Sequence, residues 1–129
     1  MSMFSAIGIA QSGIGTYKAW IDATADNVAN VNNVNPTSQA AFQARRLVVE
    51  SAPGGGVRIQ RAEFGNPDGR VVYDPENPLA DEQGLVRMPD MNMSDEMTSL
   101  IIAQRAYQAN VTAFERARDG YLRELEIGK

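Results

Sequence analysis

The sequence of 129 residues contains no histidine and no cysteine. The lack of histidine removes the commonest general base of enzymes, and the lack of cysteine removes thiol nucleophiles and disulfides. Without either residue almost every type of zinc site is excluded. Any catalytic chemistry would therefore use carboxylate, hydroxyl or lysine side chains. Because cysteine is absent, the sequence gives no indication of whether the protein works in an oxidising or a reducing compartment.

Three further features are missing. No apolar run reaches the length of about 18 residues that a membrane span requires, and the first residues lack the basic region and cleavage site of a Sec signal. The net charge of −4 leaves no general excess of basic groups to displace the counterions of a nucleic acid. We therefore expect no membrane span, no Sec signal and no nucleic-acid partner.

Charged residues and prolines divide the chain into three segments. Residues 1–36 contain three charged residues and residues 92–129 contain eleven, whereas residues 37–91 hold five of the six prolines. We predict an N-terminal coiled-coil helix in 1–36, a small β-rich domain in 37–91, and a C-terminal coiled-coil helix in 92–129. The two helices are expected to pack together as one helical domain.

Apolar residues in both terminal segments follow the spacing of a helix seam. In the first segment an isoleucine or valine recurs every seventh residue, and from Met93 to Leu125 the spacing alternates between four and three. The predicted fold is mainly α, with two long terminal helices paired as an antiparallel coiled coil and a short antiparallel β segment between them. The seam residues that we expect to pack subunits together are Ile7, Ile14, Tyr17, Ile21, Val28, Leu100, Tyr107, Val111, Phe114 and Leu125.

Capping residues predict where these helices begin and end. Ser2 or Ser5 is suited to cap the first helix, which should end near residue 31 in an asparagine-rich stretch. Asn92 or Ser94 is suited to cap the second helix, and Lys129 complements the negative end of its dipole.

Glycines weaken the first helix. Gly8, Gly13 and Gly15 each cost roughly 1 kcal/mol relative to alanine, so the helix needs a partner to be stable. Gly13 and Gly15 followed by Lys18 superficially resemble a phosphate loop, but no predicted strand precedes them and no Gly-Lys-Ser/Thr follows. Close helix packing is the favoured interpretation of these glycines.

The middle segment alternates strand-forming runs with turn residues. Strands are predicted over 42–50, 56–64, 70–73 and 85–88, joined by turns at 54–56 and 66–69, and a small antiparallel sheet is expected. The acidic residues of this segment could bind calcium or cleave a glycoside. The favoured interpretation is that they are solvent-exposed turn residues. They are Asp68, Asp74, Glu76, Asp81 and Glu82.

Four arginines on neighbouring predicted strands could bind phosphate or peptidoglycan. The alternative is pairing with nearby Glu50 and Glu63, which we favour because the segment holds eight acidic against six basic residues. The arginines are Arg45, Arg46, Arg58 and Arg61.

None of the motifs considered above favours an active site. We therefore expect no catalytic residue, no cofactor and no metal.

Large apolar residues remain outside the two seams. A monomeric helical hairpin, such as a soluble adaptor, is one interpretation of the paired seams, but it would leave Phe4, Ile101, Ile102 and Leu122 without cover. Further subunits would bury them.

Short motifs at both ends resemble the paired terminal signatures of bacterial flagellar rod, hook and hook-associated proteins. These motifs are residues 26–30 and residues 97–110, and the stretch 72–89 resembles the short proximal-rod members of the flagellar basal-body rod family. The chain departs from that pattern at Asn33, Asn77 and Asp90. The signature residues are Asn27, Asn30, Arg105, Tyr107, Ala109 and Asn110.

This resemblance implies a structural subunit of the basal body, not an enzyme, that builds the proximal rod and transmits motor torque across the periplasm. It implies export without a Sec signal through the flagellar type III apparatus. The implied partners are copies of the chain itself, other rod proteins and the adaptor between the MS ring and the rod. The alternative function is a peptidoglycan-acting or carbohydrate-binding module in the middle segment.

Overall fold

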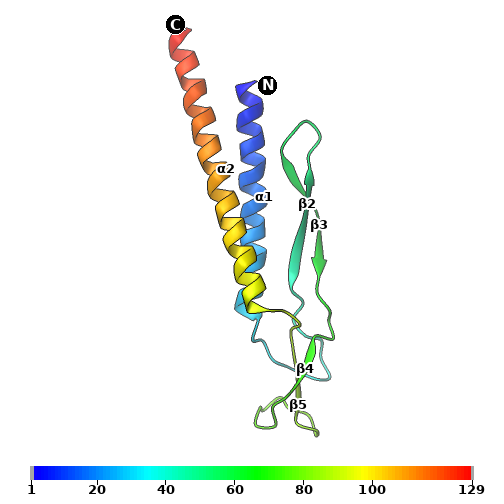
Figure 1. Cartoon of the computed structure of the whole chain (residues 1–129). Helices are drawn as coiled ribbons and strands as arrows, with labels where there is room; N and C mark the ends of the chain where they lie inside the picture. Colours follow the sequence, from blue (N-terminus) through cyan, green and yellow to red (C-terminus); the bar gives the residue numbers. More distant parts are fainter. Residues whose placement is uncertain (1, 129) are drawn as a thin grey trace.

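The computed structural model describes residues 2–128 and consists of two long helices with short strands between them. Helix α1 (Met3–Asn30) and helix α2 (Met93–Ile127) run antiparallel side by side, so both chain termini lie at one end of the molecule (Figure 1). We call this end the terminal end, and the opposite end, next to the strands, the β end. The expected mainly α fold with a small antiparallel β region is confirmed.

Both helices begin at residues that the sequence marks as caps. The Ser2 hydroxyl accepts a hydrogen bond from the backbone N–H of Ser5 at 3.1 Å, and α1 ends at Asn30, close to the predicted end. Asn92 caps α2 by accepting from the backbone N–H of Ser94 at 2.8 Å. The predicted role of Lys129 lies outside the described residues.

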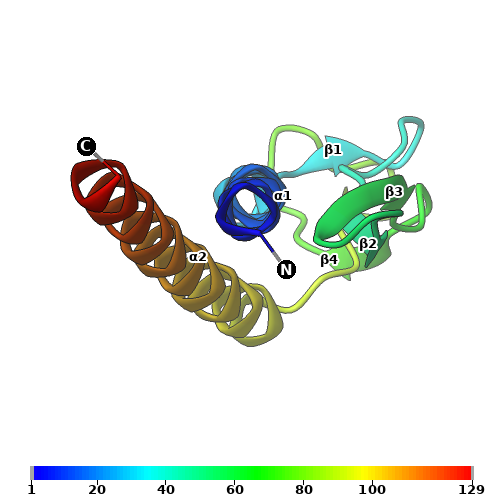
Figure 2. The same cartoon turned by 90° about the horizontal axis from the view of Figure 1, so that it is seen from above.

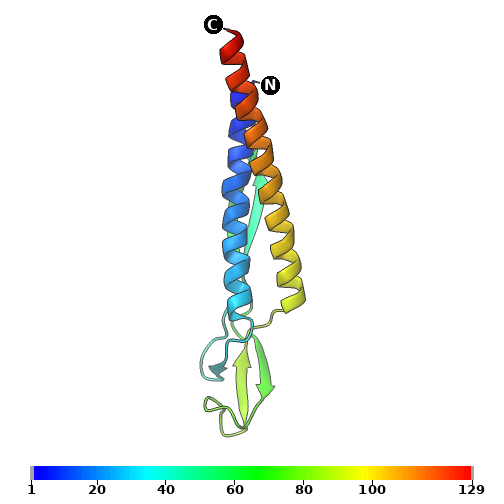
Figure 3. The ribbon, with the colours of Figure 1, turned by 90° about the vertical axis from the view of Figure 1, so that its left-hand side faces the viewer.

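The helices differ in length. Helix α1 has 28 residues and α2 has 35. Since each residue adds 1.5 Å, α2 is about 10 Å longer. Its C-terminal end extends past the start of α1, as Figures 1 and 3 show.

The strands form two separate sheets, so the expectation of one small sheet was wrong. Strands β2 (Arg45–Ser51) and β3 (Val57–Phe64) form a hairpin, and β4 (Arg70–Tyr73) and β5 (Leu85–Met88) pair at the β end of the molecule. The turn between β3 and β4 contains Pro67 and redirects the chain before β4 begins, so β4 pairs with β5 instead of the hairpin.

Strand bounds differ slightly from the prediction. Strand β2 begins three residues later than expected, whereas β4 and β5 match the predicted ranges. Strand β1 (Asn35–Pro36) was missed, because two residues that include a proline give no strand pattern. It pairs with β5 at the sheet edge.

The hairpin lies along α1, on another side of that helix from α2 (Figure 2). Near its turn, the backbone N–H of Val57 donates to the Ser12 hydroxyl at 3.1 Å, and that hydroxyl donates to the carbonyl of Ile9 at 2.7 Å. A Cβ on Gly56, whose φ is +86°, would collide with Ser12. Glycine therefore both closes the turn and allows the hairpin to approach α1.

The interior is built mainly from small residues. The buried apolar residues of the helices are Ala10, Ala23 and Ala103, and Gly13 is buried as well. A Cβ on Gly13 would overlap the carboxamide of Asn110 on α2. The interpretation of this glycine as a close-packing residue is therefore confirmed, while Gly8 and Gly15 face open space.

Candidate functional site

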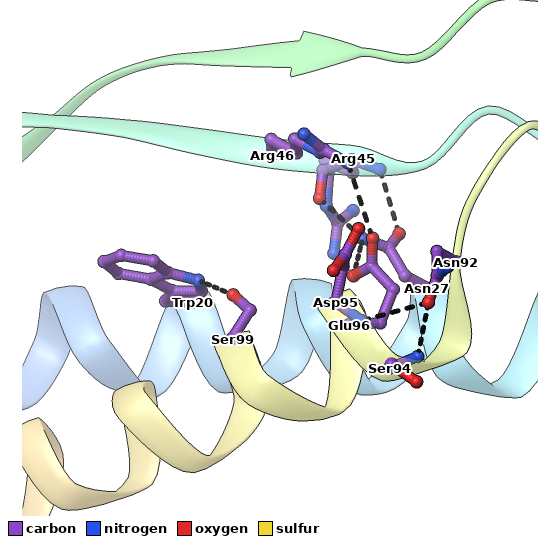
Figure 4. A network of polar contacts seen from close by, with 9 residues as sticks. All are labelled: Trp20, Asn27, Arg45, Arg46, Asn92, Ser94, Asp95, Glu96 and Ser99. Carbon is purple, nitrogen blue, oxygen red and sulfur yellow. Dashed lines mark hydrogen bonds and ion pairs between the residues drawn. The ribbon is translucent and has the colours of Figure 1, made fainter.

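A polar network joins three elements at the β end of the helix pair (Figure 4). Asn27 of α1 is 1% exposed, and its Nδ2 donates to the backbone carbonyl of Arg45 on β2 at 2.9 Å and to Glu96 Oε2 on α2 at 3.1 Å. Its Oδ1 accepts from the backbone N–H of Arg45 at 2.9 Å. The carboxamide thus pairs with the backbone of β2 as a neighbouring strand would.

Glu96 is the second centre of this network. It is 4% exposed, although it carries a carboxylate and lies in the first turn of α2. Three groups lie against this side chain: the Asn27 amide, the N-terminal turn of α2, and Arg46, whose Nη2 lies 3.8 Å from Glu96 Oε1. A buried charge needs such partners, since desolvation alone would exclude it.

A further contact lies one turn along α2. Trp20 Nε1 donates to the Ser99 hydroxyl at 3.0 Å, which joins α1 to α2. Between Trp20, Glu96 and strand β2 lies a cavity of about 360 Å³. The β end therefore combines directional contacts with an unfilled space.

Towards the terminal end the contacts between the helices become apolar or small. Asn110 packs over Gly13, and its Nδ2 donates to the carbonyl of Ala106 at 2.8 Å. The rings of Phe4 and Tyr121 lie 4.9 Å apart.

The predicted seam residues flank this contact. Nine of the ten are half-buried, and Leu125 is 49% exposed. The buried apolar residues of both helices are alanines, Ala10 and Ala23 of α1 and Ala103 of α2. Small residues let the two backbones approach, and the large side chains then lie beside the line of closest contact. Whether the seam packs subunits together stays a prediction.

The family-signature residues differ in their surroundings. Asn27 and Asn110 contact the other helix, and Asn30 Nδ2 bonds only locally, to the carbonyl of Asp26 at 2.9 Å. Tyr107 is half-buried. Arg105 and Ala109 are exposed on α2.

Sequence reasoning did not find the network partners of Asn27. As an acidic residue in a first helical turn, Glu96 indicates only a complement to the helix dipole, and Arg45 indicates only a basic patch or an ion pair. The Arg45 contact uses backbone atoms, which leave no trace in the sequence. A clue for Glu96 is its position in the first turn of a helix whose cap is already supplied by Asn92.

Two of the four hairpin arginines pair with the glutamates that were expected. Arg58 Nε lies 2.7 Å from Glu50 Oε1, and Arg61 Nη2 lies 2.6 Å from Glu63 Oε1. The hairpin therefore carries alternating charges and not a basic patch.

Asp81 is engaged in holding its own loop. Its Oδ1 accepts from the backbone N–H groups of Leu85 and Gln83, each at 2.9 Å, and its Oδ2 accepts from the Thr37 hydroxyl at 2.9 Å. These bonds, that from Leu85 above all, hold the pKa of Asp81 below its ordinary value of 3.8. This agrees with the interpretation of the acidic residues as turn residues.

Other sites considered from the sequence find no support among residues 2–128. The residues from Gly13 to Lys18 are helical and form no phosphate loop. Within the described chain, no group of three or more acidic side chains is arranged to hold a metal ion. Neither described helix is long and apolar enough to cross a bilayer.

Comparison with known proteins identifies the family. Residues 82–121 match the family described as flagellar basal body rod FlgEFG protein, C-terminal. The chain is 34% identical to the flagellar basal-body rod protein FlgC of Yersinia enterocolitica and 31% identical to that of Salmonella typhimurium, over the whole of each chain. It is 25% identical to FlgC of Bacillus subtilis, again over both whole chains.

Paired terminal helices and these matches define a flagellar basal-body rod protein. Within that class, the chain belongs to the FlgC family. The resemblance carried by the terminal signatures and the 72–89 stretch is therefore confirmed.

Proposed function

We propose that the chain is a structural subunit of the proximal rod of the flagellar basal body, and that it transmits torque through packing between subunits. Its membership of the FlgC family supports the role of rod subunit, because the curated relatives are named flagellar basal-body rod proteins. These relatives are structural proteins and not enzymes. No reaction is needed for this role.

Uncovered apolar surface on both helices is the observation that carries the proposal. Phe4 is 67% exposed, Ile102 is 53% exposed and Ile127 at the end of α2 is 84% exposed. Ile101 and Leu122 are exposed as well. A single copy cannot bury these side chains, since the paired helices already meet along their small residues. Neighbouring subunits would bury them, with a gain of about 25 cal/mol per Å² of apolar surface.

An open helical assembly provides such neighbours. Each subunit repeats the same heterologous contacts, so one surface of a copy meets a different surface of the next. In this arrangement residues 1–36 and 92–129 form the helical wall, and residues 37–91 lock neighbours laterally. The seam residues Ile7, Ile14, Tyr107 and Val111 would pack between copies.

The proposed partners follow from this role. They are copies of the chain, other rod proteins, and the adaptor between the MS ring and the rod. The proposed location is the periplasmic part of the basal body, reached through the flagellar type III export apparatus without a Sec signal. The weakened helix α1 suits that route, since ordering is then completed by burial in the rod.

The test places a charge on the seam. Ile14→Asp and Val111→Asp are expected to abolish swimming and to remove the protein from isolated basal bodies, because a carboxylate would be buried without a partner. The matched control is Thr112→Asp, which adds the same charge at an exposed position of α2. Normal swimming by both seam variants would contradict the proposal.

A further inference from the structure

The sheet of strands β1, β5 and β4 is set apart from the rest of the molecule. Strands β4 and β5 lie beyond the ends of both helices (Figure 1). Among the described residues, no strand of this sheet packs against either helix or against the hairpin. The orientation of the sheet therefore depends on the connecting segments. Two of them, residues 37–44 and 65–69, join the sheet to the base of the hairpin, and we call this pair of segments the neck.

Backbone hydrogen bonds hold the two segments of the neck side by side. The N–H of Ala41 donates to the carbonyl of Pro67 at 2.7 Å, and the N–H of Gly65 donates to the carbonyl of Ala44 at 2.9 Å. The neck therefore extends the hairpin toward the sheet. The hairpin in turn is held against α1 at its base by the carboxamide of Asn27.

Arg87 on β5 clamps both segments at the sheet end of the neck. Its Nη1 donates to the carbonyl of Asp68, and its Nη2 donates to the carbonyl of Thr37 at 2.9 Å. Within residues 2–128 this guanidinium forms no ion pair, and its Nε is buried without a hydrogen-bond partner. A buried polar atom is seldom left unpaired. The side chain is therefore positioned by the two carbonyls, which a planar guanidinium can hold in one fixed geometry.

We propose that Arg87 makes the joint between the sheet and the helix pair rigid, so that the two parts move as one body. The contacts run from β5 through Arg87 to the neck, and from the hairpin through Asn27 to α1. Without the guanidinium, the sheet is free to rotate about the neck. A rigid joint passes a twist of the helices on to the sheet, and this consequence rests on the proposed function. The rigidity itself is a property of the single chain.

Distances between two spin labels test the joint, because the chain contains no cysteine that would take up a label elsewhere. The label pair Ala25→Cys/Gln83→Cys spans the joint, from an exposed position of α1 to an exposed position between β4 and β5. The pair Ala25→Cys/Gln108→Cys lies within the helix pair, also at exposed positions. In the purified full-length chain, both pairs are expected to give a narrow distribution of distances by double electron-electron resonance.

Arg87→Ala is expected to broaden the distribution across the joint about twofold, and to leave the distribution within the helix pair unchanged. The matched control is Arg70→Ala. In the described chain the side chain of Arg70 bonds to Met88 and to the carbonyl of Pro89, at the end of β5 and not at the neck. This control should give a narrow distribution across the joint. An unchanged distribution in Arg87→Ala, or equal broadening in the two variants, overturns the proposal.

A second variant decides the matter if Arg87→Ala disturbs the sheet itself. Arg87→Lys keeps the charge and much of the alkyl stem but loses the two-pronged donor. It is expected to broaden the same distribution while the backbone amides of β4 and β5 stay protected from hydrogen exchange. A lysine variant as narrow as the original chain, or loss of protection in both variants, overturns the proposal. The proposed function is decided separately, by whether Ile14→Asp and Val111→Asp enter basal bodies.

Discussion

The two ends of the helix pair are held together by different chemistry. At the β end, Asn27, Glu96 and the Trp20–Ser99 hydrogen bond make directional contacts between the helices. At the terminal end the contacts are the packing of Gly13 against Asn110 and an aromatic pair. The contacts of the β end are hydrogen bonds between named atoms, whereas those toward the terminal end depend on how closely the surfaces fit. The β end therefore fixes how the helices pair through directional bonds, and the terminal end adds close packing.

The largest effect is expected at the centre of the polar network. Asn27→Ala removes three hydrogen bonds and leaves the Arg45 backbone and the buried Glu96 without that partner. The free energy of unfolding should fall by about 3 kcal/mol, because buried polar groups lose their bonds and regain no water. Urea unfolding followed by circular dichroism measures the change.

The control for this prediction is Asn30→Ala. Asn30 Nδ2 bonds only to Asp26 within the same helix at the surface, so the loss should stay below about 0.5 kcal/mol. Equal losses for the two variants would show that the network does not fix the pairing of the helices.

Substitution of two glycines of α1 tests how closely the helices pack toward the terminal end. Gly13→Ala should destabilise the chain by about 1–3 kcal/mol, because the new methyl group overlaps the Asn110 carboxamide. Gly15→Ala faces open space and should stabilise α1 by about 0.5–1 kcal/mol. Thermal unfolding of the two variants measures both values, and a shared sign would mean that the helices are not closely packed at Gly13.

The smallest expected effect concerns Asp81, which lies outside the polar network. It is a change in how the free energy of unfolding depends on acidic pH. The folded state holds the pKa of Asp81 below 3.8, so the unfolded chain binds this proton more readily. The contribution to stability is therefore complete above pH 3.8 and is lost as the pH falls through the lowered pKa.

Substitution separates this contribution from those of other carboxylates. Asp81→Asn should weaken the dependence of stability on pH in the acid range, whereas the exposed Glu82→Gln should leave the Asp81 part intact. Urea unfolding at several acidic pH values compares the variants. An unchanged acid profile in Asp81→Asn would show that this loop does not contribute.

Local signals were sufficient for most of the elements. Ser2 and Asn92 cap the helices because their side-chain oxygens satisfy free backbone N–H groups, a purely local effect. The hairpin turn at Gly54–Gly56 follows from positive φ values that only glycine adopts freely. These features were predicted because each depends on neighbours in sequence.

The helix faces that contact each other could not be predicted from such local signals. The seven-residue spacing of Ile7 and Ile14 indicates an apolar stripe, but the closest contact is made by Gly13 and the alanines beside it. Size alone does not say whether a large side chain lies between two helices or beside them, since that depends on how closely the backbones approach.

The sequence by itself determined which residues form the two helices, where each helix begins and which segments between them form strands. Periodicity and capping are sufficient for this because they act over a few residues. Only the tertiary structure decided that Asn27, Arg45 and Glu96 form one buried network and that the strands divide into two sheets. Such contacts join residues up to 69 positions apart. Their energy depends on desolvation and on exact geometry, and both exist only after the chain has folded.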